Sequence, residues 1–416
     1  MINYPQKLDP IFHKLDKICA IPVIVGGFVR DSILKIASKD IDIEIYGLES
    51  FESLESILNE FGSVNSVGKS FGVCKLTIGD LDLDFSLPRE DSKISIGHKG
   101  FNIRIDSTLD FKTASSRRDF TINAIGYDVI RKTILDPFNG IEDLNNNILR
   151  VVDEIKFQED PLRILRAVQF SARFNLKIDL QLLLLSQQMC KDRMLKELAK
   201  ERIFDEIKKL LLKAEKPSIG LKLLKKIGAL VEFPHLPNLN TTDWNDILTT
   251  TDRMKAIIPV KNQIVLMLST ICYKLDEIQI QEFIRYLTNE KNILKQVLVL
   301  TKNINLYNHT DYQLYKLATI LKIEELILLN KAIYQEGSLN YKKILSIEKR
   351  AKELKIINSP YKAIIEGKDI LKFGIKPSKI YSKILNDAYE AQINSIFKTR
   401  KEGLTWLKNY IEKTLI

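Results

Sequence analysis

Hydrophobic and polar positions follow two different periods along the chain. In the first 150 residues, short alternating or β-branched runs typical of strands are separated by segments with apolar residues at helical spacing. From about Gln181 onward, Leu and Ile recur at helical spacing and strand signals are few. The chain is therefore expected to begin with an α+β head and to continue as an all-helical region. The pattern predicts helices over residues 10–19, 29–36 and 50–61, and strands over residues 21–25, 64–67, 72–78 and 81–89.

Composition adds limits on size and location. The chain has 416 residues, 45% of them hydrophobic, which is enough for two or more domains with their own cores. No apolar run reaches 18 residues and the N-terminus lacks an apolar signal segment, so neither a membrane span nor secretion is expected. A reducing, cytoplasmic location is expected, because the four cysteines show no metal-like spacing and are interpreted as buried thiols: Cys19, Cys74, Cys190 and Cys272.

Charge is distributed unevenly along the chain. Residues 1–150 contain 18 Lys and Arg against 22 Asp and Glu, a net charge of −4, whereas the remainder has 45 against 31, a net charge of +14. An acidic head with a basic C-terminal part suits an enzyme that holds a polyanion. The alternative is a Lys-rich composition without function, because Lys, Ile, Leu and Asn are abundant throughout.

A glycine pair follows the first predicted strand. Gly26 and Gly27 allow a sharp turn into a helix, whose N-terminal N–H groups suit a phosphate, and Arg30 adds a cation in its first turn. Asp40 and Asp42 are two residues apart on the next strand, so both carboxylates leave the same face. They repel each other unless a cation lies between them, and paired divalent ions of phosphoryl transfer would fill that place.

The order of strand, Gly-Gly turn, arginine, helix and Asp-x-Asp resembles the signature of the DNA polymerase beta-like nucleotidyltransferase superfamily. Over roughly its first half, the chain is similar to the class II, bacterial-type tRNA nucleotidyltransferases and poly(A) polymerases. This resemblance implies a mixed sheet with helices in the head, followed by an all-α neck, body and tail. The implied domains are a catalytic head at 1–148, a base-reading neck at 149–213, a body at 214–350 and a tRNA-binding tail at 351–416.

The resemblance also implies a third catalytic carboxylate. Asp82 and Asp84 share one face of a predicted strand, and Asp84 matches the family pattern better. In the family, the segment corresponding to residues 94–104 is a loop that helps to change nucleotide specificity. It is expected to be mobile here, with His98 in contact with solvent or phosphate rather than acting as a general base.

A second motif runs from Arg117 through Arg118 and Asp119 to Asn123. Arginines bind phosphates in a bidentate manner, so triphosphate or primer phosphate is the expected partner. Asp119 and Asn123, four residues apart, are expected on one helical face, and the resemblance implies that they hold the ribose hydroxyls. It also implies a flexible hinge in residues 135–144.

The stretch from Glu159 to Arg166 carries the clearest chemistry. Glu159 and Asp160 precede Pro161, which favours a helix start, and Asp160, Arg163 and Arg166 follow at three-residue intervals along one face. An Asp accepts from an exocyclic amine and an Arg donates to a ring nitrogen, so the pair would select cytosine and adenine and reject uracil and guanine. The alternative is a helix-capping acid beside surface arginines. The resemblance carries base reading over to Asp160 and Arg163, and places Arg166 near the phosphates.

The C-terminal half carries little explicit chemistry. Residues 196–206 resemble the last family motif, in which Glu201 and Arg202 would brace the neck. Many relatives have a phosphohydrolase domain with His-Asp pairs in the body, but this chain has four histidines and no His-Asp pair, so residues 214–350 are expected to be a degenerate scaffold at most. The family's body and tail bind the acceptor arm and elbow of tRNA.

The expected activity is template-independent addition or repair of the 3′-terminal CCA of tRNA from CTP and ATP, with release of pyrophosphate. Asp40 and Asp42 would hold two Mg²⁺ ions, and no protein partner is expected. Three alternatives remain open: a poly(A) polymerase, an enzyme that adds only CC or only the terminal A, and an inactive RNA-binding relative. The first is disfavoured because a Gly-Arg-Arg-Phe-type signature is replaced by residues 67–72, and the last because the acidic and base-reading residues are intact.

Overall fold

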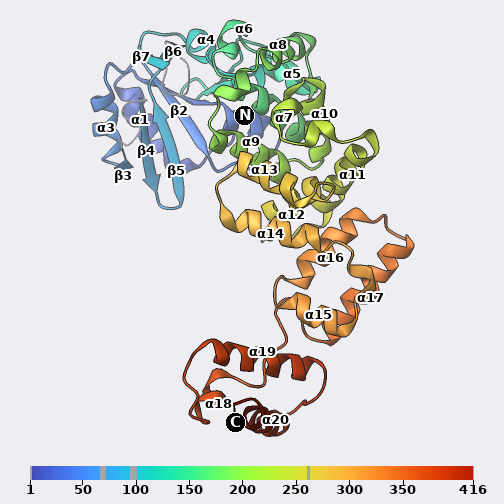
Figure 1. Cartoon of the computed structure of the whole chain (residues 1–416). Coiled ribbons are helices and arrows are strands. Elements are labelled where there is room, and N and C mark those ends of the chain that lie inside the picture. The colour runs from blue at the N-terminus through green and yellow to red at the C-terminus, as the bar shows by residue number, and fades with distance from the viewer. Residues whose placement is uncertain (1, 66–71, 94–100, 260–262, 416) are drawn as a thin grey trace. The chain divides into compact units, whose positions relative to one another are not determined.

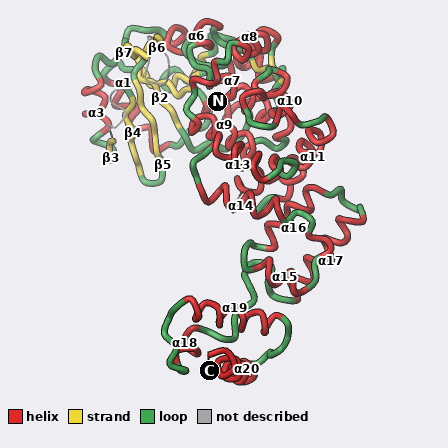
Figure 2. Tube along the Cα trace, viewed as in Figure 1, coloured by secondary structure: helices red, strands yellow, loops and turns green. Residues whose placement is uncertain are grey.

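The structure is a computed structural model that describes residues 2–65, 72–93, 101–259 and 263–415. The chain divides into two compact units. The first comprises Met1–Leu239 with Tyr286–Thr288, and the second comprises Asn240–Arg285 with Asn289–Ile416. Strands are confined to the first unit, as the yellow segments of Figure 2 show for the described residues. The expected α+β head followed by helices is confirmed, while the finer domain boundaries stay a prediction.

A mixed sheet organises the head. In the parts of the chain that are described, seven strands form it in the order β3-β4-β5-β2-β1-β8-β9 (Figure 1). A separate antiparallel ribbon consists of β6 and β7, and a short parallel pair of β10 and β11. The strands are β1 Ile21–Val25, β2 Ile41–Tyr46, β3 Ser63–Asn65, β4 Val73–Ile78, β5 Leu81–Ser86, β6 Arg89–Lys93, β7 Phe101–Ile105, β8 Gly126–Asp128, β9 Thr133–Leu135, β10 Ile148–Leu149 and β11 Lys177–Ile178.

The centre of this sheet places two acidic positions side by side. Strands β2 and β5 pair in parallel, with Asp42 opposite Asp84, while the other pairs of the sheet are antiparallel. Ile41, Ile43 and Ile45 of β2 point into the core and are at most 2% exposed. The alternate residues of β2 therefore emerge on the opposite face.

Helices cover the sheet and continue beyond it within the first unit. Helix α2 packs against β1 and β2, and α7 packs against α9 and α10. Helix α7 buries Ile164, Leu165 and Val168, which leaves its arginines on the remaining face. The helices of this unit are α1 Asp9–Lys17, α2 Gly27–Ile33, α3 Phe51–Leu58, α4 Phe111–Ser115, α5 Gly140–Asn145, α6 Glu154–Gln158, α7 Leu162–Phe174, α8 Leu180–Lys191, α9 Lys200–Lys213 and α10 Pro217–Lys226.

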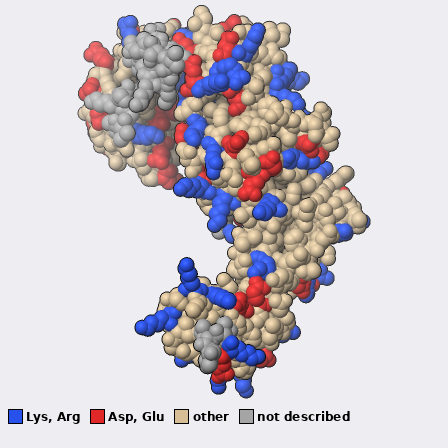
Figure 3. Space-filling view, in the orientation of Figure 1, with Lys and Arg blue, Asp and Glu red and all other residues tan. Residues whose placement is uncertain are grey.

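The second unit contains helices joined by loops and turns, and no strand, in its described residues. Its last three helices pack around Ile370, Ile384 and Leu407, all at most 1% exposed. On the face shown in Figure 3, Lys and Arg are interspersed with Asp and Glu over the helical parts. The remaining helices of the chain are α11 Thr241–Ile257, α12 Gln263–Cys272, α13 Glu277–Leu287, α14 Lys291–Lys302, α15 Asp311–Ala318, α16 Ile323–Ile333, α17 Leu339–Glu353, α18 Gly367–Leu371, α19 Lys379–Ile393 and α20 Arg400–Leu415.

Some local expectations need correction. Cys19 is exposed rather than buried, whereas the other three thiols are buried as expected. The loop expected over residues 94–104 ends earlier, because β7 begins at Phe101. Residues 94–100, with His98, lie outside the described residues, as do residues 67–71 of the segment used to disfavour a poly(A) polymerase. Within the described ranges, every helix is too short or too polar to cross a membrane.

Gly140, in the segment expected to be a hinge, is tightly packed. It is the first residue of α5, and a Cβ there would lie 2.3 Å from the carbonyl oxygen of Thr121. The close approach of the Gly140 and Thr121 backbones therefore explains why a glycine is present at position 140. A hinge in residues 135–144 stays a prediction.

We expect Gly140→Ala to lower the free energy of unfolding by about 1–3 kcal/mol, because the methyl group must displace the backbone of Thr121. Denaturant unfolding of the full chain measures this change. Asn145→Ala, at an exposed position of the same helix, is the control and should leave the stability nearly unchanged. Equal stability of the two variants would contradict the packing argument.

Candidate active site

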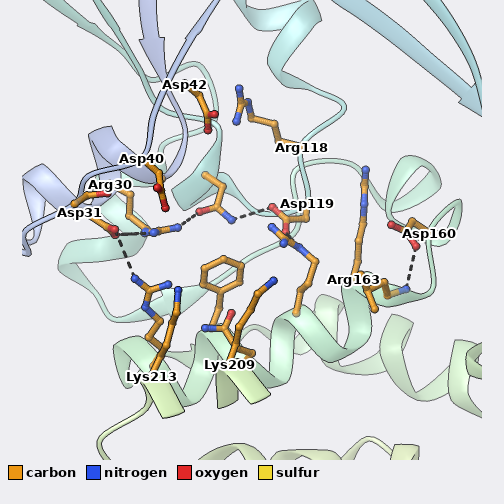
Figure 4. A pocket seen from close by; sticks show the side chains of 18 of the residues that line it. Arg30, Asp31, Asp40, Asp42, Arg118, Asp119, Asp160, Arg163, Lys209 and Lys213 are labelled. Atoms are coloured by element: carbon orange, nitrogen blue, oxygen red, sulfur yellow. Dashed lines mark hydrogen bonds and ion pairs between the residues drawn. The ribbon is translucent and has the colours of Figure 1, made fainter. Parts of the chain in front are cut away.

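A cleft of about 650 Å³ lies in the first unit, between the head sheet and helices α7 and α9 (Figure 4). Ten Lys or Arg residues and five Asp residues line it, so its charge suits a polyanion. Eleven of the thirteen predicted site residues line it, while Gly26 immediately precedes the lining residue Gly27 and Asp84 lies on β5, next to β2. The lining residues are Gly27, Arg30, Asp31, Ala37, Ser38, Lys39, Asp40, Asp42, Arg117, Arg118, Asp119, Asn123, Asp160, Leu162, Arg163, Arg166, Gln169, Phe170, Arg173, Arg202, Lys209 and Lys213.

The acidic residues enter the cleft from β2. Asp40 immediately precedes β2 and Asp42 is its second residue, and Figure 4 shows both on the same side of the cleft. Asp84 is the register partner of Asp42 on β5, and its carboxylate lies 3.4 Å from Lys75 Nζ. The predicted third carboxylate is thus adjacent to the pair.

The Asp42 side chain is exposed to the cleft, although the protein around it removes part of its hydration. Desolvation raises its pKa above the ordinary value, Arg118 opposes this effect, and Asp84, Glu44 and Asp40 add to it. Negative charges that raise one another's pKa are stabilised by a bound cation. The site therefore favours a positively charged ligand.

Carboxylate oxygens of this kind are the ligands that Mg²⁺ prefers. Asp40 and Asp42 fit a divalent ion by their donor chemistry and by the raised pKa of Asp42. The described residues form no group of three or more Asp, Glu, His or Cys close enough to hold a metal ion by themselves. Part of the coordination shell would therefore come from water or from the phosphates of a substrate, as is usual for Mg²⁺.

The glycine turn is tighter than a simple phosphate loop. Gly26 has φ +69°, and its N–H donates to the carbonyl of Ile125 at 3.1 Å, so this N–H is already bonded. A Cβ at Gly26 would lie 2.6 Å from Arg118 Nη1. Gly26 thus makes room for a guanidinium, while Gly27 lines the cleft itself.

Arg30 is buried and has internal partners. Its Nε donates to Asp31 at 2.8 Å, and its Nη1 donates to Asn123 Oδ1. The guanidinium lies 4.5 Å from the ring centre of Phe174 and 5.2 Å from that of Phe170 on α7. Arg30 therefore links α2 to α7, and its role in triphosphate binding stays a prediction.

Arg117 and Arg118 line the cleft, and both form an ion pair with the same buried residue, Glu44. Nη2 of Arg117 lies 2.5 Å from Glu44 Oε1, and Nη2 of Arg118 lies 3.2 Å from the same oxygen. Glu44 is buried on β2. The two guanidinium groups are thus held side by side at the wall of the cleft.

Asp119 and Asn123 are brought together, although not by an α-helix. Asp119 precedes a short 3-10 helix, Thr121–Asn123, so the expected helical face is wrong. Asn123 Nδ2 donates to Asp119 Oδ1 at 2.9 Å, and Arg166 Nε donates to Asp119 Oδ2 at 2.6 Å. The two predicted ribose-binding residues form one hydrogen-bonded group at the cleft.

Asp119 should stabilise the fold at neutral pH and lose this contribution in acid. Burial alone would raise its pKa, but Arg166, Asn123 and Arg163 hold the pKa below the ordinary value near 3.8. A lowered pKa in the folded state gives stability that is present above the ordinary value and lost as the pH falls through the folded value. We therefore expect the stability difference between wild type and Asp119→Asn to shrink below about pH 4. Unfolding measured from pH 6 to pH 3 tests this, and Asp16→Asn, at an exposed position on α1, should show no such trend.

The predicted base-reading residues lie at the start of α7. Asp160 precedes the helix instead of belonging to it, and its Oδ1 accepts from Leu162 N–H at 3.1 Å. Arg163 donates to the carbonyl oxygens of Lys156 at 3.0 Å and Arg117 at 2.6 Å. Both side chains are therefore anchored beside the cleft (Figure 4).

Sequence reasoning missed the wall formed by α9. Arg202 Nη2 lies 3.0 Å from Asp160 Oδ2, so the residue expected to brace the neck contacts a predicted base reader. Lys209 and Lys213 follow on the same helix and also line the cleft. Positions 202, 209 and 213 recur at near-helical spacing, but this signal does not stand out in a Lys-rich helix. Arg173, on α7, was missed in the same way.

Comparisons with known proteins extend this picture. A family model described as the poly A polymerase head domain matches residues 23–150. A second, described as the probable RNA and SrmB-binding site of polymerase A, matches residues 175–239. The two models follow each other in the order expected for a head and a neck.

Two curated proteins are similar to this chain in sequence. The chain is 35% identical over 220 residues to a multifunctional CCA protein of Haemophilus ducreyi, which covers 52% of this chain and 51% of that protein. It is 29% identical to a CCA-adding enzyme of Blochmanniella floridana, over 71% of this chain and 76% of that protein. The chain thus matches about half the length of the first of these relatives.

Two solved structures show the same fold. The CCA-adding enzyme of Bacillus stearothermophilus with CTP superposes with a TM-score of 0.75 at 21% identity, covering 99% of this chain and 100% of that one. The Thermotoga maritima CCA-adding enzyme complexed with tRNA gives 0.70 at 20%, covering 99% and 97%. Residues 23–150 therefore match the head domain of poly A polymerases, residues 175–239 match a probable RNA-binding region of polymerase A, and the chain shares the fold of these CCA-adding enzymes.

Proposed function

We propose that this chain adds or repairs the 3′-terminal CCA of tRNA without a nucleic-acid template, using CTP and ATP and releasing pyrophosphate. The observation that carries the proposal is the shared cleft: Asp40 and Asp42 line one wall, and Asp160 and Arg163 line another. A cleft that combines acids for phosphoryl transfer with a base-reading pair needs no template strand. The CTP and tRNA complexes of related folds support the choice of substrates.

The acidic residues would act at the phosphates. Asp40 and Asp42 would hold the two Mg²⁺ ions, with Asp84 beside them, and when bound these ions lower the pKa of the tRNA 3′-hydroxyl and neutralise the triphosphate. Arg117, Arg118 and the Gly26–Gly27 turn would face the triphosphate. Arg166 donates a hydrogen bond to Asp119 and would also lie near the phosphates.

The base and the ribose would be read by fixed groups. Asp160 would accept from the exocyclic amine of cytosine or adenine, and Arg163 would donate to the adjacent ring nitrogen. Arg202 and two backbone carbonyls hold this pair before substrate arrives, which reduces the ordering cost of binding. Asp119 and Asn123 would hold the ribose hydroxyls.

The RNA partner would be tRNA, bound through its acceptor arm and elbow. The match of residues 175–239 to an RNA-binding model and the net charge of +14 beyond residue 150 support this partner. The tail, residues 351–416, is proposed to bind the elbow. A cytoplasmic location follows from the proposed substrate.

Purified chain should be incubated with tRNA transcripts that end before CCA, after C and after CC, with each nucleotide singly and then with CTP and ATP together. We expect growth to stop once CCA is complete, with UTP and GTP refused. A long A tail would instead indicate a poly(A) polymerase, and arrest after CC or action on the CC-ended transcript alone would indicate a divided task. No incorporation with Mg²⁺ would leave only RNA binding.

A further inference from the structure

Glu44 is a buried carboxylate behind the cleft. It lies on β2, two residues after Asp42, and only 1% of the residue is exposed. A carboxylate removed from water is costly unless opposite charges and hydrogen bonds replace its hydration. The groups that contact Glu44 therefore indicate why it is there.

Both oxygens of Glu44 have partners. Oε1 accepts from Arg117 at 2.5 Å and from Arg118 at 3.2 Å, and Oε2 accepts from the hydroxyl of Tyr46 at 2.8 Å. Two guanidinium groups and one hydroxyl thus replace the water that the buried carboxylate has lost.

The two arginines extend from Glu44 to the working parts of the cleft. Arg118 lies against Gly26, and its charge acts on Asp42. The carbonyl of Arg117 accepts from Arg163, one of the predicted base readers, at 2.6 Å. Nε of both Arg117 and Arg118 is buried and has no hydrogen-bond partner among the described atoms, so Glu44 uses only part of their donor capacity.

We infer that Glu44 is a positioning residue that fixes the guanidinium groups of Arg117 and Arg118 for the phosphates of a nucleoside triphosphate. One carboxylate against two arginines leaves a net positive charge beside the cleft. Without it, the arginines would repel each other, and Arg118 would be drawn toward Asp42. The inference rests on the proposed function for its ligand, but it makes a separate prediction about phosphate binding.

The test is Glu44→Gln, which keeps the size of the side chain and removes its charge. Dissociation constants for CTP and for inorganic tripolyphosphate, measured by calorimetry in EDTA, should both rise about tenfold or more, because a charged hydrogen-bond acceptor is lost. Tripolyphosphate has no base or ribose, so an equal effect on both ligands places the defect at the phosphates. In nucleotide addition, KM for CTP and ATP should rise more than kcat falls, with base choice unchanged.

Two further variants separate positioning from general stability. Tyr46→Phe removes one hydrogen bond to Glu44 and should weaken tripolyphosphate binding in the same direction, but less. Asp128→Asn changes another buried carboxylate of the head sheet, 1% exposed, that accepts from Arg131 N–H at 2.9 Å. This control should lower the melting temperature and leave phosphate affinity unchanged.

A folded Glu44→Gln protein with wild-type affinity for tripolyphosphate would overturn the inference. If Glu44→Gln does not fold, Tyr46→Phe decides, because unchanged affinity there would also overturn it. Failure of the proposed function gives a different pattern: wild type would bind tripolyphosphate, with Glu44→Gln weaker, but would add no nucleotide to tRNA.

Discussion

Replacing Asp42 by Asn should abolish nucleotide addition, with a fall in rate of about 10³-fold or more. Asn keeps the shape of the side chain but removes the negative charge at a position where three other carboxylates raise the pKa of Asp42. The variant would therefore bind a divalent ion poorly, and the phosphates would lose the charge that should neutralise them. Incorporation of labelled CTP into a tRNA transcript that lacks CCA measures the effect.

Asp82→Asn is the matched control for this experiment. Asp82 is on the same strand as Asp84, is exposed, and accepts from the hydroxyl of Thr77 at 2.9 Å. Its loss should change the rate less than about threefold. Similar losses of rate in both variants would mean that any negative charge removed from this end of the sheet slows incorporation. That result would contradict a specific role for Asp42.

Asp160→Asn should change which nucleotide is used. The amide would present an N–H where the Asp160 carboxylate is proposed to accept from the exocyclic amine of the base, and it would lose the ion pair with Arg202. We expect the preference for CTP over UTP to fall about 10- to 100-fold, through loss of kcat/KM for CTP. Single-turnover incorporation of each nucleotide measures the four values of kcat/KM.

Glu159→Gln is the control for base choice, since Glu159 is the neighbouring acid and does not line the cleft. It should keep the preference for CTP and ATP. Because Asp160 also accepts from Leu162 N–H at the start of α7, the stability of Asp160→Asn must be measured in parallel. Unchanged preference in a folded Asp160→Asn protein would contradict the base-reading role.

Local spacing was sufficient to predict much of the cleft. Asp40 and Asp42 were expected together because side chains two apart on a strand share a face, and they do line one cleft, although Asp40 lies just before β2. Arg163 and Arg166 could be placed on one helix because Pro161 marks its start. Where the geometry depends on tertiary packing, prediction was weaker: Asp119 and Asn123 meet through a 3-10 turn, and Asp160 stands outside the helix that carries Arg163.

The basic wall formed by α9 and the contacts of Glu44 could not be predicted from the sequence. Which face of α9 meets the cleft depends on how it packs against α7, and amphipathic periodicity alone leaves several lysines equivalent. Glu44 follows Asp40 and Asp42 at the same two-residue interval, which was a usable signal. Its partners at positions 117 and 118 are more than 70 residues away, and strand pattern alone does not identify such contacts.

The cleft has a consequence for synthesis on the ribosome. Its lining begins at Gly27 and ends at Lys213, so the last part of its wall is translated about 190 residues after the first. Contacts so distant in sequence form late and slowly. A nascent chain that stops short of α9 would carry the acidic residues without the lysines opposite them, and it would hold phosphates poorly. The first unit should therefore acquire its proposed affinity for nucleotides in one late step, once α9 has left the exit tunnel and while the second unit is still being made.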